Sequence, residues 1–574
     1  MSTPSSILQD SEKQGRRSLD VCVEDITDKS ASDFEADVAA RVPKLRGRKL
    51  RAALAFIAGT GFTLFGYDQG VMSGLLTGNQ FEATFPQVVV DSAHPNHATL
   101  QSFIVAIYEI GCLVGALSNL WIGDRLGRRR TIFWGGIVMT VGAVLQTTSY
   151  SYAQMIVARI VTGIGNGLIT STVPSYHAEC SHASNRGSFI MFEGTMITLG
   201  LTLSYVSDRM AMSYTGLTLI LPKWIDFACY FATGSPLQWR LPIALQIILE
   251  FILAGGIMYL PESPRWLVKR GYNAEAIGVL SAIDDTDPLD PEVRKTFIAI
   301  REAVAMEGDV NKGSLKELFT GGKSQNFRRA ATGVVCQAVQ QLTGINLVSY
   351  YATILFQRLG MNEVDSRIVA ACNGTEYFLA SFLAIYFIDR AGRRKLMLIG
   401  TAGCCLTMTL LAILGAIDTP AAQIVSAVLL FGFNTFFALG WLGMGWLYPA
   451  EIVGIGIRAP ANALSTASNW TFNFLVVMIV GPAFNSISWG TYLVFAALNF
   501  ITLPIVYFFF PETAGRSLED MDIIYAVAYN EGVSPVKVSF RKDLPEAGSP
   551  EADEILGLSA MRMRSAASNS QEQE

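Results

Sequence analysis

Charged side chains are scarce in this chain. Of its 574 residues, 16% are Asp, Glu, Lys or Arg, whereas 51% are hydrophobic. A soluble globular protein carries about 25% charged residues, so the composition excludes an ordinary soluble enzyme or regulator. The net charge of -5 is modest and indicates no particular partner, and we expect no nucleic acid.

Residues that bind metals or form disulfides are also few. The eight cysteines include no C-x-x-C pair, and only Cys229 approaches the expected outer face, so neither a zinc site nor a disulfide framework is supported. The four histidines, His94, His97, His177 and His182, fall between the apolar runs, where a solvated loop imidazole is favoured over a pH-sensing role. We therefore expect no metal and no cofactor.

Long apolar runs are what the chain does have. Runs such as residues 52–76, 99–122 and 425–447 approach the roughly twenty residues that a helix needs to cross about 30 Å of hydrocarbon. They predict an all-α membrane protein with about twelve transmembrane helices. The expected spans are residues 52–76, 99–122, 131–148, 153–176, 188–231, 240–260, 330–356, 366–388, 396–416, 422–449, 459–484 and 489–510, of which the fifth is unusually long.

A basic motif between apolar runs occurs twice. Residues 123–130 read GDRLGRRR, and residues 389–395 read DRAGRRK about 265 positions later (389 minus 124). Repetition at this distance predicts two like halves of six helices each, at residues 51–260 and 329–510. The hydrophilic stretch between them, residues 261–328, carries short amphipathic segments and is expected to be a helical linker too small for a catalytic domain.

The positions of lysine and arginine predict the orientation of the chain. Most basic residues of the short loops fall in alternate gaps, while the gaps at residues 77–98, 149–152 and 417–421 have none. Because cationic loops stay on the cytoplasmic side, the linker and both termini are expected to be cytoplasmic. Residues 1–50 and most of residues 511–574 are expected to be disordered tails, and the first of these does not read as a cleaved secretory signal.

Charged side chains within the apolar runs are costly in lipid, so each is a candidate for a functional role. Asp68 in the first span and Arg159 in the fourth can pair. A proton taken up by Asp68 would release Arg159 and link protonation to conformation, whereas the alternative is a permanent structural ion pair. Glu109, Glu193 and Glu376 either contact a hydroxylated ligand or lie protonated in helix contacts.

The seventh span carries amides and phenols without charge. These residues are Gln340, Gln341, Asn346, Tyr350 and Tyr351. Amides donate and accept hydrogen bonds at once, so they suit the hydroxyls of a neutral sugar, whose apolar face can stack on rings such as Trp446 and Trp470. The alternative is that the amides bond one helix to another without touching a ligand.

Several motifs resemble those of the sugar porter family of the major facilitator superfamily, in particular its fungal members. The resemblance covers about residues 50–522. The motifs are GDRLGRR at residues 123–129, Arg159 with the glycines after it, Glu179 with Arg186 and Gly187, PESPRWL at residues 261–267, Gln340 and Gln341 with Asn346, DRAGRR at residues 389–394, and PETAGR at residues 511–516. Together they are highly specific to the family.

The resemblance implies two six-helix halves that rock about a central sugar site by alternating access. It makes Asp68 the proton acceptor and Arg159 its partner. With the amide argument it gives as sugar contacts Phe65, Glu193, Gln340, Gln341, Asn346, Tyr350, Trp446, Asn469 and Trp470. It also implies a latch of salt bridges at a cytoplasmic gate, formed by Asp124, Arg128, Glu179, Arg186, Glu262, Arg265, Asp389, Arg393, Glu451, Arg458 and Glu512.

Three features depart from the family pattern. Position 194, where the family has a sugar-binding glutamine, is Gly194 preceded by Glu193, which argues against simple hexose specificity. Residues 442–445 read LGMG in place of a Gly-Pro-x-Pro motif, although their two glycines still allow bending. Residues 206–223 read as an insertion of 18 residues (223 minus 205) in the fifth span, either a lineage-specific outer loop or a retained intron.

These observations predict a proton-coupled symporter, not an enzyme, that imports a hexose or a disaccharide such as sucrose across the plasma membrane. The expected partners are the sugar, the proton and the lipid bilayer, and the protein is expected to act as a monomer. Three alternatives stay open: a passive sugar facilitator, a polyol or quinate carrier, and a transport-inactive sugar sensor. A sensor would need partner motifs in its tail, and residues 511–574 show none.

Overall fold

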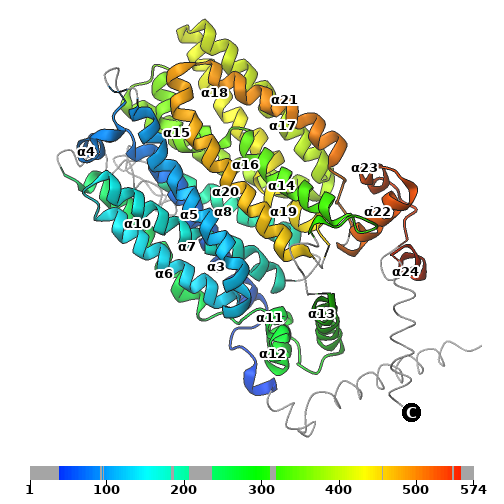
Figure 1. Ribbon diagram of the computed structural model, residues 1–574. Helices are drawn as coiled ribbons and strands as arrows, with labels where there is room; N and C mark the ends of the chain where they lie inside the picture. The colour runs from blue at the N-terminus through cyan, green and yellow to red at the C-terminus, as the bar shows by residue number, and fades with distance from the viewer. Residues whose placement is uncertain are drawn as a thin grey trace, which may run out of the picture. The chain divides into compact units, whose positions relative to one another are not determined.

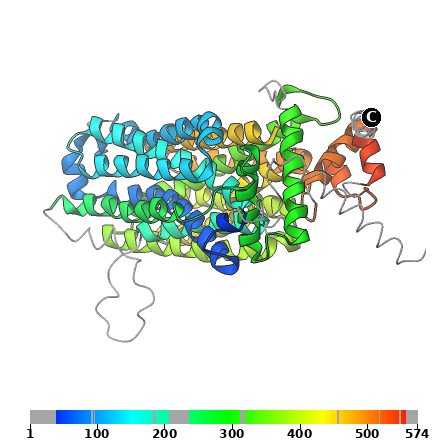
Figure 2. The ribbon, with the colours of Figure 1, turned by 90° about the horizontal axis from the view of Figure 1, so that it is seen from below.

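Helices make up all the regular structure that is described. The computed structural model describes residues 38–90, 94, 96–181, 186–205, 235–310, 318–454, 457–516, 518–545 and 549–556. Within these ranges every regular element is helical, which confirms the all-α prediction (Figures 1 and 2). Nine of the described helices are long and apolar enough to cross a membrane. Each expected span overlaps at least one described helix.

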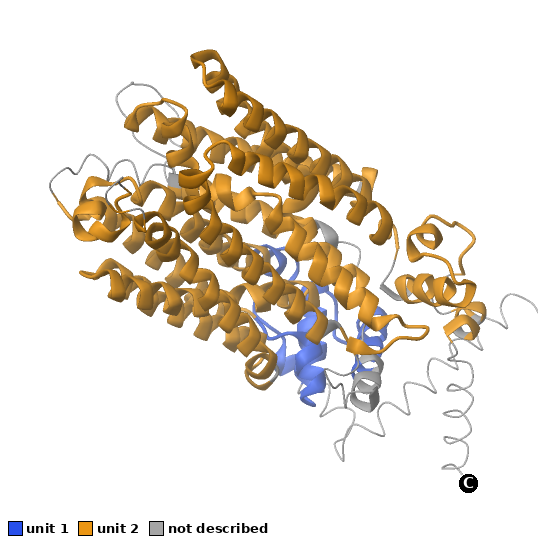
Figure 3. Ribbon diagram, turned by 45° about the horizontal axis from the view of Figure 1, so that its top comes forward, with its two compact units in different colours: residues 1–52, 261–305 blue, residues 53–260, 306–574 orange. Residues whose placement is uncertain are grey.

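The chain divides into two compact units, which Figure 3 distinguishes by colour. The smaller unit comprises residues 1–52 and 261–305, and the larger comprises residues 53–260 and 306–574. The smaller unit contains α11 (Pro264–Lys269), α12 (Asn273–Asp284) and most of α13 (Pro291–Val310). Its core includes α12, in which residues 276–283 are all buried.

The first half of the membrane bundle is held together by close helix crossings. Its helices are α3 (Gly47–Leu75), α5 (His97–Leu126), α6 (Arg128–Thr147), α7 (Tyr152–Glu179), α8 (Arg186–Tyr205) and α10 (Leu237–Ile257), with the short α4 (Asn79–Thr84) and η1 (Pro86–Val88) between α3 and α5. Gly111 of α5 faces Gly163 of α7, and a side chain at Gly163 would collide with the carbonyl oxygen of Tyr108. Small residues at such crossings let backbones approach, which lipid-exposed helices need for tight packing.

The second half repeats this plan with two interrupted spans. Its elements are α14 (Asn326–Leu342), α15 (Ile345–Arg358), α16 (Glu363–Ala391), α17 (Arg393–Ile417), α18 (Pro420–Phe437), the π-helix η4 (Ala438–Leu442), α19 (Met444–Ile452), α20 (Arg458–Ser486) and α21 (Gly490–Phe509). Gly344 separates α14 from α15 with φ of 97°, a conformation that favours glycine. The second break follows η4 at Gly443, which packs against Gly194 of α8.

The expected fifth span extends beyond the described residues. Helix α8 ends at Tyr205. Residues 206–234 lie outside the described part of the chain, so the insertion expected at residues 206–223 stays a prediction.

The expectation of a mostly disordered C-terminal tail is wrong for residues 518–545 and 549–556. These residues form α22 (Leu518–Glu531), α23 (Pro535–Ser539) and α24 (Pro550–Leu556). Helix α22 buries Ile524 and Tyr525 and is anchored by an ion pair of 2.5 Å between Asp522 Oδ1 and Arg329 Nη1 of α14. Packing against the bundle, which a local reading of the sequence does not reveal, stabilises this segment.

Candidate functional site

A buried ion pair joins α3 to α7. Arg159 Nη1 donates a hydrogen bond of 2.8 Å to Asp68 Oδ2, and both side chains are at most 1% exposed. Arg159 Nη2 also donates to the carbonyl oxygen of Val105 at 3.1 Å, and its guanidinium Cζ lies 4.6 Å from the ring centre of Tyr108. The structure therefore brings together the acid and the base that the sequence singled out.

The hydrogen bonding of this ion pair is incomplete. Asp68 Oδ1 and Arg159 Nε are buried and have no hydrogen-bond partner among the described residues. A buried pair built only for stability satisfies its polar atoms, because each unsatisfied one costs free energy. Two polar atoms of the pair thus have no hydrogen bond within the described residues, and the Tyr108 hydroxyl also interacts with the Asp68 carboxylate.

Carboxamides from α14, α15 and α20 form a second buried cluster. Asn346 Nδ2 donates to Gln341 Oε1 at 2.5 Å, and Gln341 Nε2 donates to Gln340 Oε1 at 3.4 Å. Asn469 Nδ2 of α20 donates to Gln340 Oε1 at 3.1 Å and to Gln337 Oε1 at 2.6 Å. All five side chains are buried, so the amides expected to bind sugar do converge.

Two members of this cluster were not expected from the sequence. Gln337 lies one helical turn before Gln340 and so shares its face of α14. Gln69 of α3 donates through Nε2 to Asn346 Oδ1 at 3.0 Å, although it belongs to the other half of the bundle. Its position directly after Asp68 was the only available signal.

Aromatic rings flank the carboxamides. Phe65 and Trp470 have ring centres 5.2 Å apart at an interplanar angle of 81°, and Phe62 and Trp446 meet edge to face at 5.9 Å. Each pair joins α3 to the second half. Phe62 was not foreseen, whereas the other three rings were candidate contacts. Edge-to-face pairs leave ring faces that can cover the apolar side of a sugar.

Tyr350 lies beside the ion pair rather than among the amides. Its hydroxyl donates a hydrogen bond to Glu109 Oε1 of α5, and both side chains are fully buried. The contact crosses from the second half to the first. Tyr350 and Glu109 thus link α15 to the surroundings of Arg159, with which both interact electrostatically.

The expectation of a solvated loop is wrong for His177. This residue lies in the last turn of α7 and is 2% exposed, and its Nδ1 is 2.9 Å from Glu193 Oε1 of α8. The fourth span was expected to end at residue 176, and the helix continues to Glu179. One oxygen of Glu193, a candidate sugar contact, is therefore taken by His177.

Two further acids lie in the membrane interior. Glu376 of α16 accepts a hydrogen bond of 2.5 Å from Thr435. Glu250 of α10 is fully buried and was not foreseen, although a carboxyl group inside the apolar run of residues 240–260 was a visible signal.

The two basic motifs make equivalent ion pairs at one end of the bundle, which we call the hinge end. Arg128 opens α6 directly after Gly127 and bonds Glu179, with Nε 3.1 Å from Oε2. Arg393 opens α17 directly after Gly392 and bonds Glu451, with Nη2 3.2 Å from Oε1. Both glycines have φ of 87°, so the repeat in sequence is a repeat in backbone conformation.

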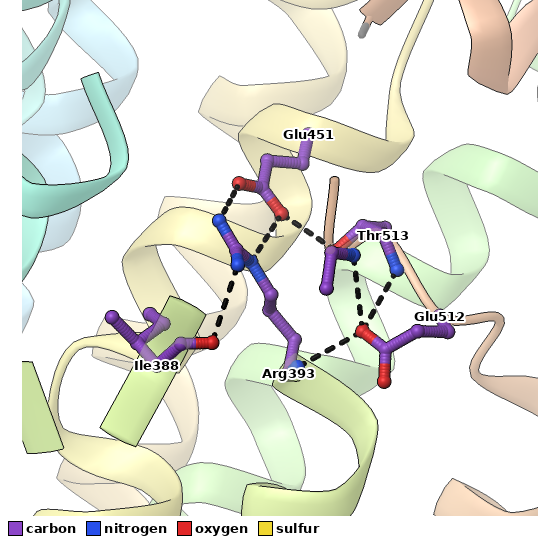
Figure 4. A network of polar contacts seen from close by, with 6 residues as sticks. Ile388, Arg393, Glu451, Glu512 and Thr513 are labelled. Carbon is purple, nitrogen blue, oxygen red and sulfur yellow. Dashed lines mark hydrogen bonds and ion pairs between the residues drawn. The ribbon is translucent and has the colours of Figure 1, made fainter. Parts of the chain in front are cut away.

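Glu512 completes the arrangement in the second half (Figure 4). Its Oε1 accepts from the backbone N–H of Arg393 at 2.9 Å, at the N-terminus of α17 where a negative charge is favoured. Thr513 donates to Glu451 Oε2 at 2.6 Å. Glu451 thus holds the guanidinium of Arg393, while Glu512 holds its backbone N–H.

Six expected gate residues stay untested. The side chains of Asp124, Arg186, Asp389 and Arg458 lie outside its described part. Glu262 and Arg265 belong to the smaller unit, where Glu262 is buried and accepts from the backbone N–H of Ser263 at 3.0 Å. Their role in a latch stays a prediction.

The two halves are hydrogen-bonded at the end opposite the hinges, which we call the far end. Arg367 of α16 donates to the carbonyl oxygens of Gly74 and Thr77 at 2.9 and 2.8 Å, at the C-terminal end of α3. Tyr351 of α15 donates to Ser102 Oγ of α5 at 3.2 Å. Alternate opening of the bundle at this end requires these bonds to break.

Two like halves around buried acids, a base and amides define a membrane carrier of the major facilitator type rather than an enzyme. Residues 54–525 match the family described as "Sugar (and other) transporter". The chain is 38% identical over 516 residues to the "Sugar transporter STL1" of Saccharomyces cerevisiae, covering 89% of this chain and 87% of that protein. It is 40% identical over 518 residues to the "Major facilitator superfamily transporter mfsA" of Aspergillus fumigatus, covering 88% and 91%.

Solved structures agree with this assignment. The proton:xylose symporter XylE bound to 6-bromo-6-deoxy-D-glucose matches with a TM-score of 0.68 and 25% identity, over 83% of this chain and 99% of that one. The chain belongs to the family of membrane sugar transporters of the major facilitator superfamily. This confirms the predicted family and fold and the expectation of a transporter rather than an enzyme.

Proposed function

We propose that this protein is a monomeric proton-coupled symporter that imports a hexose or a disaccharide such as sucrose across the plasma membrane. The observation that carries the proposal is the buried Asp68–Arg159 pair, in which Asp68 Oδ1 has no hydrogen-bond partner among the described residues. Gln69, the next residue in the sequence, is bonded to the carboxamide of Asn346. A proton on Asp68 removes one of two buried charges and so changes what holds α3 to α7.

The carboxamides form the sugar site. The carboxamides bond one another, so sugar binding exchanges amide–amide bonds for amide–hydroxyl bonds without leaving buried groups unpaired. This exchange suits a neutral polyhydroxyl solute, since no member of the cluster is charged. Trp446 and Trp470 cover the ring of the sugar.

Transport proceeds by alternating access. The hinge end is cytoplasmic, as are both termini, because the basic loops lie there. The bonds from Arg367 to α3 support a bundle closed at the far, extracellular end. Return to the outward-open form breaks these bonds and brings the hinge-end ion pairs of the two halves together as the latch.

The proton gradient supplies the work. One charge crossing the membrane contributes about 2.3 kcal/mol per 100 mV, which corresponds to roughly fifty-fold accumulation of a neutral sugar. Uptake of labelled glucose, sucrose and sorbitol by cells that express the protein, with and without a protonophore, tests the proposal. Accumulation must collapse when the protonophore is added. Full accumulation without a gradient contradicts symport.

A passive facilitator is the second candidate. The observation that favours it is the short, fully buried contact between Asp68 and Arg159, which a permanent structural pair would also show. A facilitator equilibrates sugar and never concentrates it. The protonophore experiment separates the two, because facilitated entry reaches the external concentration with or without the gradient.

A further inference from the structure

The C-terminal end of α3 is hydrogen-bonded to the second half of the bundle. Gln69 Nε2 donates to Asn346 Oδ1 at 3.0 Å, and Ser73 Oγ lies 3.5 Å from Thr353 Oγ1. Thr77 accepts from Arg367. Gln69 and Ser73 are four residues apart and so lie on one face of the helix, and Thr77 follows two residues after its end.

Helix α3 also packs directly against the first half. Side chains at Gly66 and Gly70 would collide with the Ile197 carbonyl and the Ser204 hydroxyl of α8, so the two backbones are in direct contact. Tyr67 donates to the carbonyl oxygen of Pro242 at 2.8 Å. The Asp68–Arg159 pair joins α3 to α7 of the same half.

Asp68 and Gln69 are consecutive and therefore point in different directions, about 100° apart around the helix. Asp68 faces the base and Gln69 faces the amides. A change at Asp68 does not reach Asn346 through space. It reaches Asn346 when α3 shifts as a rigid element, because the helix carries both side chains.

Several groups share the surroundings of Asp68. The charged and titratable side chains that interact with it are Arg159 of α7, Tyr108, Glu109 and Cys112 of α5, Glu250 of α10 and Tyr350 of α15. Arg159 is the only cation among them and donates a hydrogen bond to Asp68 Oδ2, and the Tyr108 hydroxyl interacts with the same carboxylate. Protonation of Asp68 thus changes its contact with α7 first.

We propose that Gln69 is the positioning residue through which the charge of Asp68 controls the sugar site. The inference rests on the proposed symport. While Asp68 is bonded to Arg159, α3 holds the Gln69 amide on Asn346 and keeps Asn346 Oδ1 occupied. When Asp68 takes a proton, α3 shifts, the amide leaves Asn346, and this oxygen accepts a bond from a sugar hydroxyl. By linkage, bound sugar favours the protonated form of Asp68 to the same extent.

The proposal predicts a specific defect for Gln69→Leu. Without the Gln69 amide, Asn346 Oδ1 is free to accept a sugar hydroxyl whatever the charge on Asp68. Sugar affinity then no longer depends on the protonation of Asp68. For the wild-type protein in proteoliposomes, we expect the KM for sugar to be roughly three- to tenfold lower at pH 5.5 than at pH 7.5. This ratio corresponds to the gain of one hydrogen bond between Asn346 and the sugar. In Gln69→Leu this ratio falls to about one, and accumulation drops toward equilibrium while sugar exchange continues.

Gln246→Leu is the matched control. Gln246 is a buried carboxamide of α10 whose polar atoms have no partner among the described residues, so its loss leaves the pH ratio and accumulation at wild-type values. The substrate used is whichever of labelled glucose, sucrose and sorbitol the wild-type protein accumulates. Gln69→Met, which keeps the unbranched shape, replaces Gln69→Leu if the latter does not assemble.

The outcomes separate this inference from the proposed function. If wild-type protein accumulates none of the three solutes, symport itself fails. If wild-type protein accumulates one of them and the Gln69 variant keeps both the pH ratio and the accumulation, the positioning role is overturned. Loss of exchange in a correctly assembled variant also overturns it, because Gln69 would then be needed for binding rather than for coupling.

Discussion

His177 Nδ1 and Glu193 Oε1 lie 2.9 Å apart between α7 and α8, and both side chains are almost completely buried. Replacing one member of such a pair leaves the other polar group buried without a partner, which costs free energy. Replacing both members with apolar residues removes this cost. We expect His177→Leu to lower stability by about 3 kcal/mol and His177→Leu/Glu193→Leu to restore most of it. Thermal unfolding in detergent measures the stability of both variants. If His177→Leu alone is as stable as the wild-type protein, the expectation is contradicted.

The glycine crossing of α5 and α7 gives a second prediction. A side chain at Gly163 meets the backbone of Tyr108, which cannot move without separating the helices. Gly163→Val should therefore prevent assembly of the bundle. Gly255→Val on α10, where a Cβ meets nothing within 4 Å, is the control and should assemble normally. Size-exclusion chromatography of tagged protein compares the two.

The C-terminal helix α22 should contribute to stability through Asp522. Its carboxylate bonds Arg329, which is 1% exposed and whose guanidinium Cζ lies 4.8 Å from the ring centre of Tyr525. Asp522→Ala removes a charged hydrogen bond and should cost about 2 kcal/mol. Asp543→Ala, at an exposed position of the same segment, should have no measurable effect. Equal unfolding temperatures for the two variants would argue that α22 is not anchored in this way.

Glu82 of α4 predicts how the stability of the far end depends on pH. Burial, and then the charge of Glu363, raise the pKa of Glu82 above its usual 4.5. The folded protein therefore binds this proton more readily than the unfolded chain, and stability rises as pH falls from the raised pKa toward 4.5. Glu82→Gln should flatten this dependence and stabilise the protein slightly at pH 7.5. The test is to measure the unfolding temperatures of the wild-type protein and of Glu82→Gln between pH 7.5 and pH 5. Identical pH profiles for the two proteins would refute the prediction.

Much of the fold was accessible from the sequence because lipid imposes strict rules. Every span must be helical and apolar, and a charge within it must find a partner, so the spans and the Asp68–Arg159 pair could be anticipated. The Gln69–Asn346 bond could not, since one sequence does not reveal how each helix is rotated about its axis. His177 was misread because the end of α7 was placed three residues too early (179 minus 176), which moved a buried side chain into a loop.

The C-terminal helices illustrate a different limit. Residues 523–525 are apolar, but a short segment of this kind becomes helical only where it packs on other elements. The buried Arg329 supplies such a contact by bonding Asp522 across a sequence separation of 193 residues. Local periodicity carries no information about such a partner.

Sugar-dependent proton entry into proteoliposomes tests the central claim most directly. With purified wild-type protein and a pH-sensitive dye in the lumen, addition of the accumulated sugar outside should acidify the lumen. Asp68→Asn should abolish this acidification while sugar exchange continues, because the asparagine cannot take up a proton. Sugar entry without acidification by the wild-type protein, or undiminished acidification by Asp68→Asn, would contradict the account.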